Sequence, residues 1–198
     1  LLAKTNPQVP RELLACQQHN YGAVNWLTNN KVAFIDSYAR QGEVKSLDID
    51  SGLTETLFSN TSYLPQALIY SQRNKQLAIT VHDDMQNTSI VFFNTQSKVA
   101  KHVQLKVPND YSDFLWWDPS WHPLKDTMIA TAKSSLFEID MTGAVIEYPI
   151  TTVADLYNPI YHPDGNKIVA VMGGVNLDIL EFIFEDKELT SNNKTQMN

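Results

Sequence analysis

A ten-residue pattern that occurs four times constrains the fold of this 198-residue chain more than any other feature. The copies align without gaps at residues 24–33, 69–78, 121–130 and 161–170. The sixth position is always Asn or Asp, at Asn29, Asn74, Asp126 and Asn166, and the tenth is always alanine. Self-similarity at separations of 40 to 52 residues indicates that one structural unit is repeated along the chain.

Each position of the pattern has a structural interpretation. We expect the large first residue to end a strand with a buried side chain, and the ninth and tenth residues to begin the next strand. The sixth residue is predicted to lie in the tight turn between them, because Asn and Asp tolerate left-handed backbone angles or cap a turn with their side chains. On this basis, valine in place of Asn166 or Asp126 should cost about 1–2 kcal/mol through backbone strain.

Further strand-like segments follow each copy, so each unit reads as a four-stranded antiparallel meander. That strand count and repeat length are typical of a β-propeller blade. The predicted fold class is all-β, a small, open or partial β-propeller of about four blades. The expected units are 22–62, 63–110, 111–152 and 153–190. A lead-in at 1–21, with helix-like residues at 10–18 or an outer strand, precedes them, and a polar tail at 191–198 follows.

The last two copies resemble the repeat of TolB-type propellers. Tyr161-His162-Pro163-Asp164-Gly165-Asn166-Lys167-Ile168-Val169-Ala170 carries that family's aromatic residue, Pro-Asp-Gly turn, basic residue and aliphatic-Ala pair. The third copy begins with Trp121-His122-Pro123 but has Leu124-Lys125 in place of Asp-Gly, and the first two copies lack the proline as well. The resemblance implies a propeller fold. It also implies one of three contexts: a periplasmic scaffold, the non-catalytic domain of a prolyl-oligopeptidase-like enzyme, or the extracytoplasmic domain of a ToxR- or CadC-like regulator.

Composition excludes several classes of function. The chain has 15 Lys and Arg against 22 Asp and Glu, a net charge of −7, which disfavours binding to nucleic acid or to an anionic membrane. A single cysteine, Cys16, excludes a disulfide framework and a cysteine-based zinc site. The sequence contains no Gly-x-Ser-x-Gly elbow, His-Glu-x-x-His motif or phosphate-binding loop. We therefore predict a protein that is not an enzyme and needs no cofactor or metal.

His122 and His162 occupy the same position in neighbouring copies, so they should lie at the same end of adjacent blades. One interpretation makes them metal ligands or a pH-sensing pair, since imidazole titrates near neutrality. The favoured interpretation is that each bonds locally within its own turn. Zinc would need a third ligand, and the sequence places no carboxylate there.

The most unusual segment, residues 111–121, holds three of the four tryptophans. Tryptophan combines a large contact area with a polar N–H group, which suits ligand pockets and interface hot spots. Trp116 and Trp117, with Asp113 and Asp118 as acidic neighbours, are therefore candidate binding residues. The alternative is a packing role, because consecutive residues of one strand point to opposite faces and at most one of the two tryptophans would be exposed.

These features predict a binding domain rather than a catalyst. The leading hypothesis is an extracytoplasmic sensor or interaction domain of a bacterial membrane-anchored transcriptional regulator, with a protein partner or small-molecule signal. Any membrane anchor would lie outside residues 1–198, and a homodimer is an open alternative. The rival hypotheses are a periplasmic scaffold of TolB type and the non-catalytic propeller of a prolyl-oligopeptidase-like serine peptidase.

Overall fold

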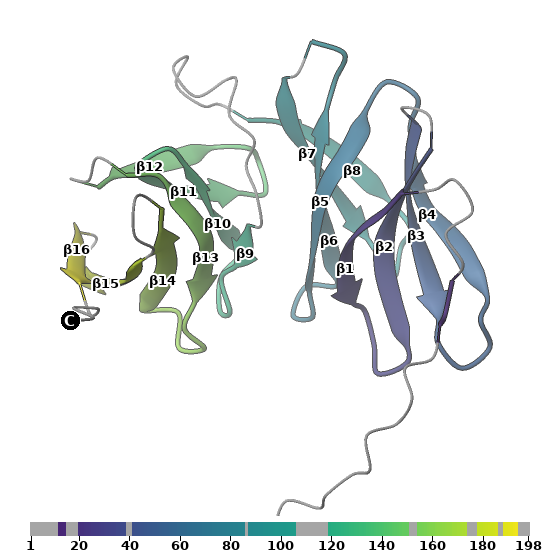
Figure 1. Ribbon diagram of the computed structural model, residues 1–198, viewed down its shortest axis with the longest axis horizontal. Helices are drawn as coiled ribbons and strands as arrows, with labels where there is room; N and C mark the ends of the chain where they lie inside the picture. Colours follow the sequence, from purple (N-terminus) through teal and green to yellow (C-terminus); the bar gives the residue numbers. More distant parts are fainter. Residues whose placement is uncertain are drawn as a thin grey trace, which may run out of the picture.

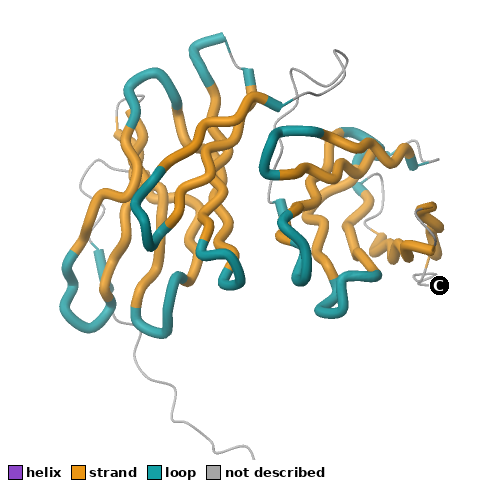
Figure 2. The backbone as a smooth tube through the Cα atoms, turned by 180° about the vertical axis from the view of Figure 1, so that it is seen from behind, coloured by secondary structure: helices purple, strands orange, loops and turns teal. Residues whose placement is uncertain are grey.

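The chain folds into four antiparallel sheets that follow one another as the blades of a β-propeller (Figure 1). The computed structural model describes residues 12–14, 20–38, 41–85, 87–105, 119–150, 154–173, 178–185 and 188–193. Within these ranges every regular element is a strand, as Figure 2 shows, and no helix is present that could cross a membrane. The predicted fold class is confirmed.

Each blade is a meander of four strands in sequence order. Blade 1 contains β1 (Asn20–Trp26), β2 (Lys31–Tyr38), β3 (Gln41–Asp48) and β4 (Thr54–Ser59). Blade 2 contains β5 (Leu64–Ser71), β6 (Gln76–His82), β7 (Thr88–Asn94) and β8 (Ala100–Gln104). Blade 3 contains β9 (Ser120–Trp121), β10 (Thr127–Ala132), β11 (Ser135–Asp140) and β12 (Val145–Pro149). Blade 4 contains β13 (Leu156–Tyr161), β14 (Lys167–Met172), β15 (Asp178–Glu185) and β16 (Glu188–Asn193).

The two ends of the chain differ from the sequence-based expectation. Most of the helix-like segment 10–18 lies outside the described residues, and residues 12–14 form neither helix nor strand. At the other end, β16 continues to Asn193, so the first three residues of the expected polar tail belong to a strand. The four-stranded unit implies a strand here, but its extent beyond residue 190 was not predicted, because its sequence is almost entirely polar and carries no alternating apolar pattern.

The first strand of each blade lies innermost. Contacts run from β1 to β5, from β5 to β9 and from β9 to β13. The fourth strands β4 and β8 are mostly exposed, and β12 is partly exposed. Apolar clusters fill the spaces between blades: Leu77 and Ile79 lie between blades 1 and 2, Phe137 between blades 2 and 3, and Phe182 between blades 3 and 4. Figure 1 shows blades 1 and 4 at opposite ends of the resulting arc.

The four repeat alanines are all buried, with at most 2% of their surface exposed, but they do not point the same way. Ala33 and Ala78 pack toward the following blade, whereas Ala130 and Ala170 pack toward the preceding one. Alanine is the third residue of the second strand in blades 1 and 2, and the fourth in blades 3 and 4. Because side chains alternate between faces, this one-residue offset exchanges the two faces. The repeat alignment therefore matches residues on the same face of the sheet between blades 1 and 2 and between blades 3 and 4. It does not do so between these two pairs of blades.

The first position of the repeat is also misaligned. The connection between the first two strands has four residues in blades 1 and 2, and five in blades 3 and 4. Trp121 and Tyr161 end their strands and are buried, with 9% and 8% of their surface exposed. Val24 lies two residues before the end of β1 and is 64% exposed. The expectation of a buried side chain at this position is therefore wrong in blade 1.

Candidate functional site

The connections between the first and second strands of all four blades gather at one end of the propeller, at the lower side of Figure 1. Two clefts open at this end. We call the one between blades 1 and 2 the first cleft, and the one between blades 3 and 4 the second cleft. Their volumes are about 680 and about 520 Å³, which is within the range of small-molecule and peptide sites.

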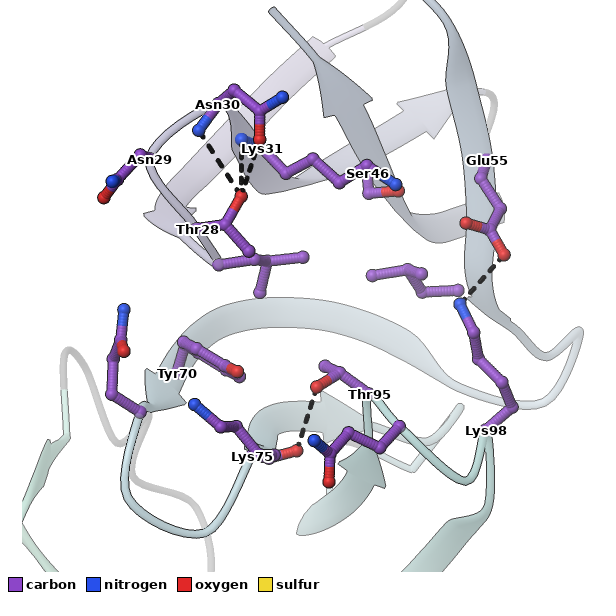
Figure 3. Close-up of a pocket in the computed structure, with 14 residues that line it drawn as sticks. Thr28, Asn29, Asn30, Lys31, Ser46, Glu55, Tyr70, Lys75, Thr95 and Lys98 are labelled. Atoms are coloured by element: carbon purple, nitrogen blue, oxygen red, sulfur yellow. Dashed lines mark hydrogen bonds and ion pairs between the residues drawn. The ribbon is translucent and has the colours of Figure 1, made fainter.

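The first cleft, drawn in Figure 3, is built mainly from polar residues of three connections and of the strands beside them. Its walls are formed by Leu27, Thr28, Asn29, Asn30, Lys31, Ser46, Glu55, Leu57, Tyr70, Gln72, Lys75, Thr95, Gln96 and Lys98. Leu57 and Tyr70 also pack against the apolar cluster between the two blades, so the cleft has an apolar base. Amide, hydroxyl and ammonium groups surround that base.

Local hydrogen bonds hold the walls of the first cleft in place. The Thr28 hydroxyl oxygen accepts the backbone N–H of Lys31 at 3.1 Å. The carbonyl oxygen of Lys75 accepts both the backbone N–H and the hydroxyl of Thr95, at 3.0 and 3.1 Å. Lys75 itself has a left-handed backbone, with φ of 54°. The β5–β6 and β7–β8 connections are thereby fastened to one another, so the blade 2 wall is preorganised.

Charge distinguishes the first cleft from the rest of the chain. Lys98 Nζ lies 2.9 Å from Glu55 Oε1 and joins the two blades across the opening, and Lys98 lowers the pKa of the Glu55 carboxyl. Lys31 and Lys75 add two further positive charges, and Figure 3 shows the Lys75 side chain turned toward the space between the blades. The cleft is therefore cationic in a chain whose net charge is −7.

The second cleft surrounds His122, which is only 5% exposed. It is lined by His122, Lys125, Glu138, Ile146, Tyr148, Tyr161 and Gly165. His122 Nδ1 accepts the backbone N–H groups of Leu124 and Lys125 at 3.0 and 3.1 Å, so the imidazole caps its own turn. Burial lowers the pKa of His122, and nearby Lys125 acts in the same direction. The ring is therefore neutral at pH 7 and is a structural element of the interface between blades 3 and 4.

Gly165 explains why the Pro-Asp-Gly turn suits this interface. Its φ is +77°, and a Cβ atom at this position would lie 2.4 Å from Cε1 of His122. The His122 ring also lies against Tyr161, with ring centroids 4.7 Å apart. Only a residue without a side chain lets the blade 4 turn approach the blade 3 imidazole this closely. His122 and Gly165 thus form one contact between adjacent repeats.

His162 occupies the equivalent backbone position but a different environment. Both histidines donate their backbone N–H to the carbonyl at the start of the next strand, at Thr127 and Lys167. The His162 side chain is 56% exposed, and its Nδ1 lies 2.8 Å from Oδ1 of Asp164 in the same turn. Among the described residues, no group of three or more His, Cys, Asp or Glu side chains is placed to hold a metal ion.

The predicted turn residues Asn29, Asn74, Asp126 and Asn166 all lie between the first and second strands of their blades. None of them has a left-handed backbone; that conformation falls on their neighbours Lys75 and Gly165. The turns are capped by other side chains: Thr28 in blade 1, His122 in blade 3 and Asp164 in blade 4. The strain-based interpretation of this position is therefore wrong.

The other candidate residues, Asp113, Trp116, Trp117 and Asp118, lie outside the described residues. The residues that line the first cleft were missed, apart from Asn29. Lys31 begins β2, whereas Lys75 and Lys98 lie in the β5–β6 and β7–β8 connections, so no local spacing links the three lysines. An alignment of the repeats with the correct strand boundaries would have placed these three lysines at the same end of their blades. That common position is the one sequence signal that could have identified the first cleft.

Blades 2 and 3 are joined by direct contacts between their inner strands and turns. Trp121 Nε1 donates to the carbonyl oxygen of Ile69 at 3.1 Å. Arg73 forms an ion pair with Asp126 across the same interface. Gly143, with φ of +83°, brings the β11–β12 turn against Val103 and Gln104 of β8. These contacts hold blades 1 and 2, which form the first cleft, in a fixed position relative to blades 3 and 4, which form the second cleft.

No protein-family model and no curated protein sequence matches the chain. Solved structures do match it. TolB from Acinetobacter baumannii superposes with a TM-score of 0.72 at 16% identity, over 98% of this chain and 48% of that one. A TolB structure from Agrobacterium tumefaciens gives 0.66 at 13% identity, over 90% and 63%. A prolyl endopeptidase gives 0.60 at 10% identity, over 90% and 30%.

These similarities establish the fold, a propeller of TolB type. The chain spans about half the length of the Acinetobacter TolB and less than a third of the prolyl endopeptidase. The expected resemblance to TolB-type propellers, which rested on one close copy of the repeat, is thus confirmed at the level of structure.

Proposed function

We propose that this chain is a non-enzymatic propeller domain that binds an acidic segment of a protein partner in the first cleft. The observation that carries the proposal is the cationic opening between blades 1 and 2, where Lys31, Lys75 and Lys98 outnumber the single acidic side chain, Glu55. A carboxylate can accept charge-assisted hydrogen bonds from these ammonium groups. The neighbouring amides of Asn29, Asn30, Gln72 and Gln96 suit the peptide groups of an extended segment.

The charge of the whole chain makes this proposal selective. With a net charge of −7, the surface as a whole repels acidic peptides and attracts basic ones. Binding of an acidic peptide therefore requires a local positive site. The apolar base formed by Leu57 and Tyr70 adds a surface on which a side chain of the ligand can pack.

The test uses two fluorescein-labelled peptides, hexaglutamate and hexalysine, and measures fluorescence anisotropy at low salt. We expect hexaglutamate to bind and its affinity to fall as NaCl is added, because salt screens exposed charges. Lys75→Ala should weaken binding at least about threefold, which corresponds to the loss of one exposed charge contact. Lys125→Ala, in the corresponding connection of blade 3, is the matched control and should bind like wild type.

Two results would overturn the proposal. One is binding of hexalysine with no binding of hexaglutamate, which would locate the ligand on the acidic surface instead. The other is equal affinity of wild type and Lys75→Ala for hexaglutamate, which would exclude the first cleft as the binding site.

For the biological setting, we propose an extracytoplasmic sensor or interaction domain of a bacterial membrane-anchored transcriptional regulator. The similarity to TolB propellers supports an extracytoplasmic setting, and the acidic charge is compatible with a domain that does not itself contact DNA. The coding sequence around this segment tests the proposal. A basic winged-helix region followed by an apolar span of about 20 residues upstream would support the regulator, whereas a cleavable signal and further Pro-Asp-Gly repeats would favour a periplasmic scaffold.

A second candidate setting is the non-catalytic propeller of a serine peptidase, which the similarity to a prolyl endopeptidase favours. This reading requires a hydrolase segment elsewhere in the same protein. A Gly-x-Ser-x-Gly motif in the coding sequence after Asn198 would support it, and its absence from the full open reading frame would reject it.

A further inference from the structure

The second cleft places a carboxylate among apolar side chains. Glu138 of β11 stands on the face of blade 3 that packs against blade 4, two residues after buried Leu136 and opposite Ile146 of β12. Within the described part of the chain, its one hydrogen-bond partner is the Tyr148 hydroxyl, which donates to Oε2 at 2.9 Å, and it forms no ion pair. A carboxylate has about four acceptor positions, so Glu138 can receive further donors from a ligand.

Three aromatic rings line the same cleft. They belong to His122, Tyr148 and Tyr161, and the ring centroids of His122 and Tyr161 are 4.7 Å apart. Burial, together with the hydrogen bond to Glu138, raises the pKa of Tyr148 to about 12. Burial also raises the pKa of Tyr161, and the charge of Glu138 adds to this effect. Both phenols are therefore neutral at pH 7, and the negative charge of Glu138 acts on both of them.

The electrostatics of the second cleft favour a cation over an anion. The faces of tyrosine rings attract positive charge, and a neighbouring carboxylate adds to that attraction. His122 contributes no positive charge, because its ring is neutral at pH 7. Among the described lining residues Lys125 is the one lysine or arginine, and it is exposed, so solvent and salt screen its charge. Glu138 is half-buried and is screened less.

We propose that the second cleft binds an organic cation, carried by an ammonium or a guanidinium group. The charged group lies against the Glu138 carboxylate, and the rings of Tyr148 and Tyr161 contact it through their faces. Ile146, which is 57% exposed, provides an apolar surface for the alkyl part of the ligand. The cation can belong to a small free amine or to a basic side chain of a protein. This proposal is independent of the one for the first cleft, which concerns ligands of opposite charge.

The test follows the backbone amide signals of Lys125 and Gly165 in proton–nitrogen NMR spectra of the chain at constant ionic strength. The probes are N-acetylarginine methylamide, its uncharged isostere N-acetylcitrulline methylamide, and tetramethylammonium chloride. We expect saturable shifts with the cations, and binding of the citrulline derivative at least about fivefold weaker than that of the arginine derivative. Either cation supports the proposal: tighter binding of the arginine derivative points to a protein side chain, and tighter binding of tetramethylammonium to a small free amine.

A pair of glutamate variants assigns the binding to this cleft. Glu138→Gln removes the charge but keeps an oxygen for the Tyr148 hydroxyl, and should weaken binding of the arginine derivative at least about fivefold. Glu147→Gln is the matched control and should bind like wild type. Glu147 is also half-buried on blade 3 and accepts a hydroxyl, from Ser135 at 2.9 Å. It lies between Ile146 and Tyr148 on β12, so its side chain points to the opposite face of the sheet.

Two further variants separate the contributions of charge and ring. Lys125→Ala removes a repulsive charge and should bind the arginine derivative at least as tightly as wild type. Tyr148→Leu removes an aromatic face and should weaken binding of both cations. Far-UV circular dichroism and urea unfolding show whether each variant folds.

Four results would overturn the proposal. They are absence of saturable shifts with both cations, equal affinity for the arginine and citrulline derivatives, unchanged binding by Glu138→Gln or an equal loss in Glu147→Gln, and weaker binding by Lys125→Ala. Hexaglutamate binding is measured separately, so failure of cation binding leaves the first-cleft proposal standing.

Discussion

Asn74 donates a hydrogen bond from its side-chain amide to Oδ1 of Asp126 at 3.2 Å, although the two residues are 52 positions apart in the sequence. They occupy the same position in successive repeats, so the turns of blades 2 and 3 touch through equivalent residues. Arg73 pairs with the same carboxylate. In blades 2 and 3, the Asn/Asp position of the repeat thus contributes to contact between blades rather than to a left-handed backbone in its own turn.

The cost of removing this contact should be small and sensitive to salt. The side chains of Arg73 and Asp126 are 42% and 60% exposed. We expect Asp126→Ala to lower the free energy of unfolding by less than about 1 kcal/mol, as for other exposed ion pairs. Urea unfolding in low and high NaCl checks this, and the difference between wild type and variant should shrink at high salt. A salt-independent loss would contradict the ion-pair explanation.

Gly165 should tolerate substitution far less well than its neighbour Asn166. Alanine at 165 would have to keep a φ of +77° and place its Cβ against the His122 ring, so we expect Gly165→Ala to destabilise the fold by about 2–4 kcal/mol. Asn166 has no left-handed backbone, so Asn166→Val should change stability by less than about 0.5 kcal/mol. Thermal and urea unfolding measure both.

Gly52→Ala is the control that separates backbone strain from crowding. Gly52 has a similar φ of +73°, but nothing lies within 4 Å of its added Cβ. We expect a loss of about 1–2 kcal/mol, from the backbone alone. If Gly52→Ala and Gly165→Ala cost the same, the close approach to His122 contributes nothing.

Stability should fall on mild acidification because His122 is buried in its neutral form. Its pKa in the folded protein lies below the ordinary value of 6.5. As the pH falls below that ordinary value, the unfolded chain binds a proton that folded His122 does not, so the free energy of unfolding decreases until the folded pKa is reached. Urea midpoints at pH about 7.5 and about 5.5 measure the effect.

Two variants assign this pH dependence. His122→Asn retains an oxygen that can accept the backbone N–H groups of Leu124 and Lys125, but it removes the titrating ring. We expect a smaller drop in its urea midpoint between the two pH values. His162→Asn removes an imidazole that is 56% exposed and should preserve the wild-type drop. The reverse pattern would contradict the role given to His122.

Trp121 should matter through its indole N–H as well as its size. We expect Trp121→Phe to cost about 1–3 kcal/mol, because the carbonyl of Ile69 loses its 3.1 Å donor and the interface between blades 2 and 3 loses volume. Trp26→Phe is the comparison, since Trp26 is 56% exposed, and should stay within about 0.5 kcal/mol. Unfolding is followed by circular dichroism, so the loss of a fluorophore does not affect the reading.

The sequence predicts the fold well because each blade is a local meander. Strand alternation, turn residues and the repeated alanine depend on neighbours within about ten residues, and all of them are visible in the sequence. The prediction failed where a single residue changed the length of a connection. An ungapped alignment cannot detect that Ala78 and Ala130 point in opposite directions, because residue identity is independent of which face a side chain occupies.

The candidate sites could be predicted less well than the fold. The local role of His122 follows from its place in the turn, but its burial depends on Gly165 of the next blade. The first cleft joins Lys31, Lys75 and Lys98 only because blades 1 and 2 stand side by side. Trp116 and Trp117, with Asp113 and Asp118, remain predicted binding residues outside the described part of the chain.

The exposed outer strands have a consequence for aggregation. β4 and β8 are edges of their sheets, and an unpaired edge is a template on which strands of other molecules can add. Exposed charged residues occupy these edges, among them Glu55 on β4 and Lys101 on β8. A strand added alongside would bring its own backbone and side chains against these charges, which discourages fibril growth. Concentrated solutions of the folded protein should therefore resist the formation of cross-β fibres from these edges.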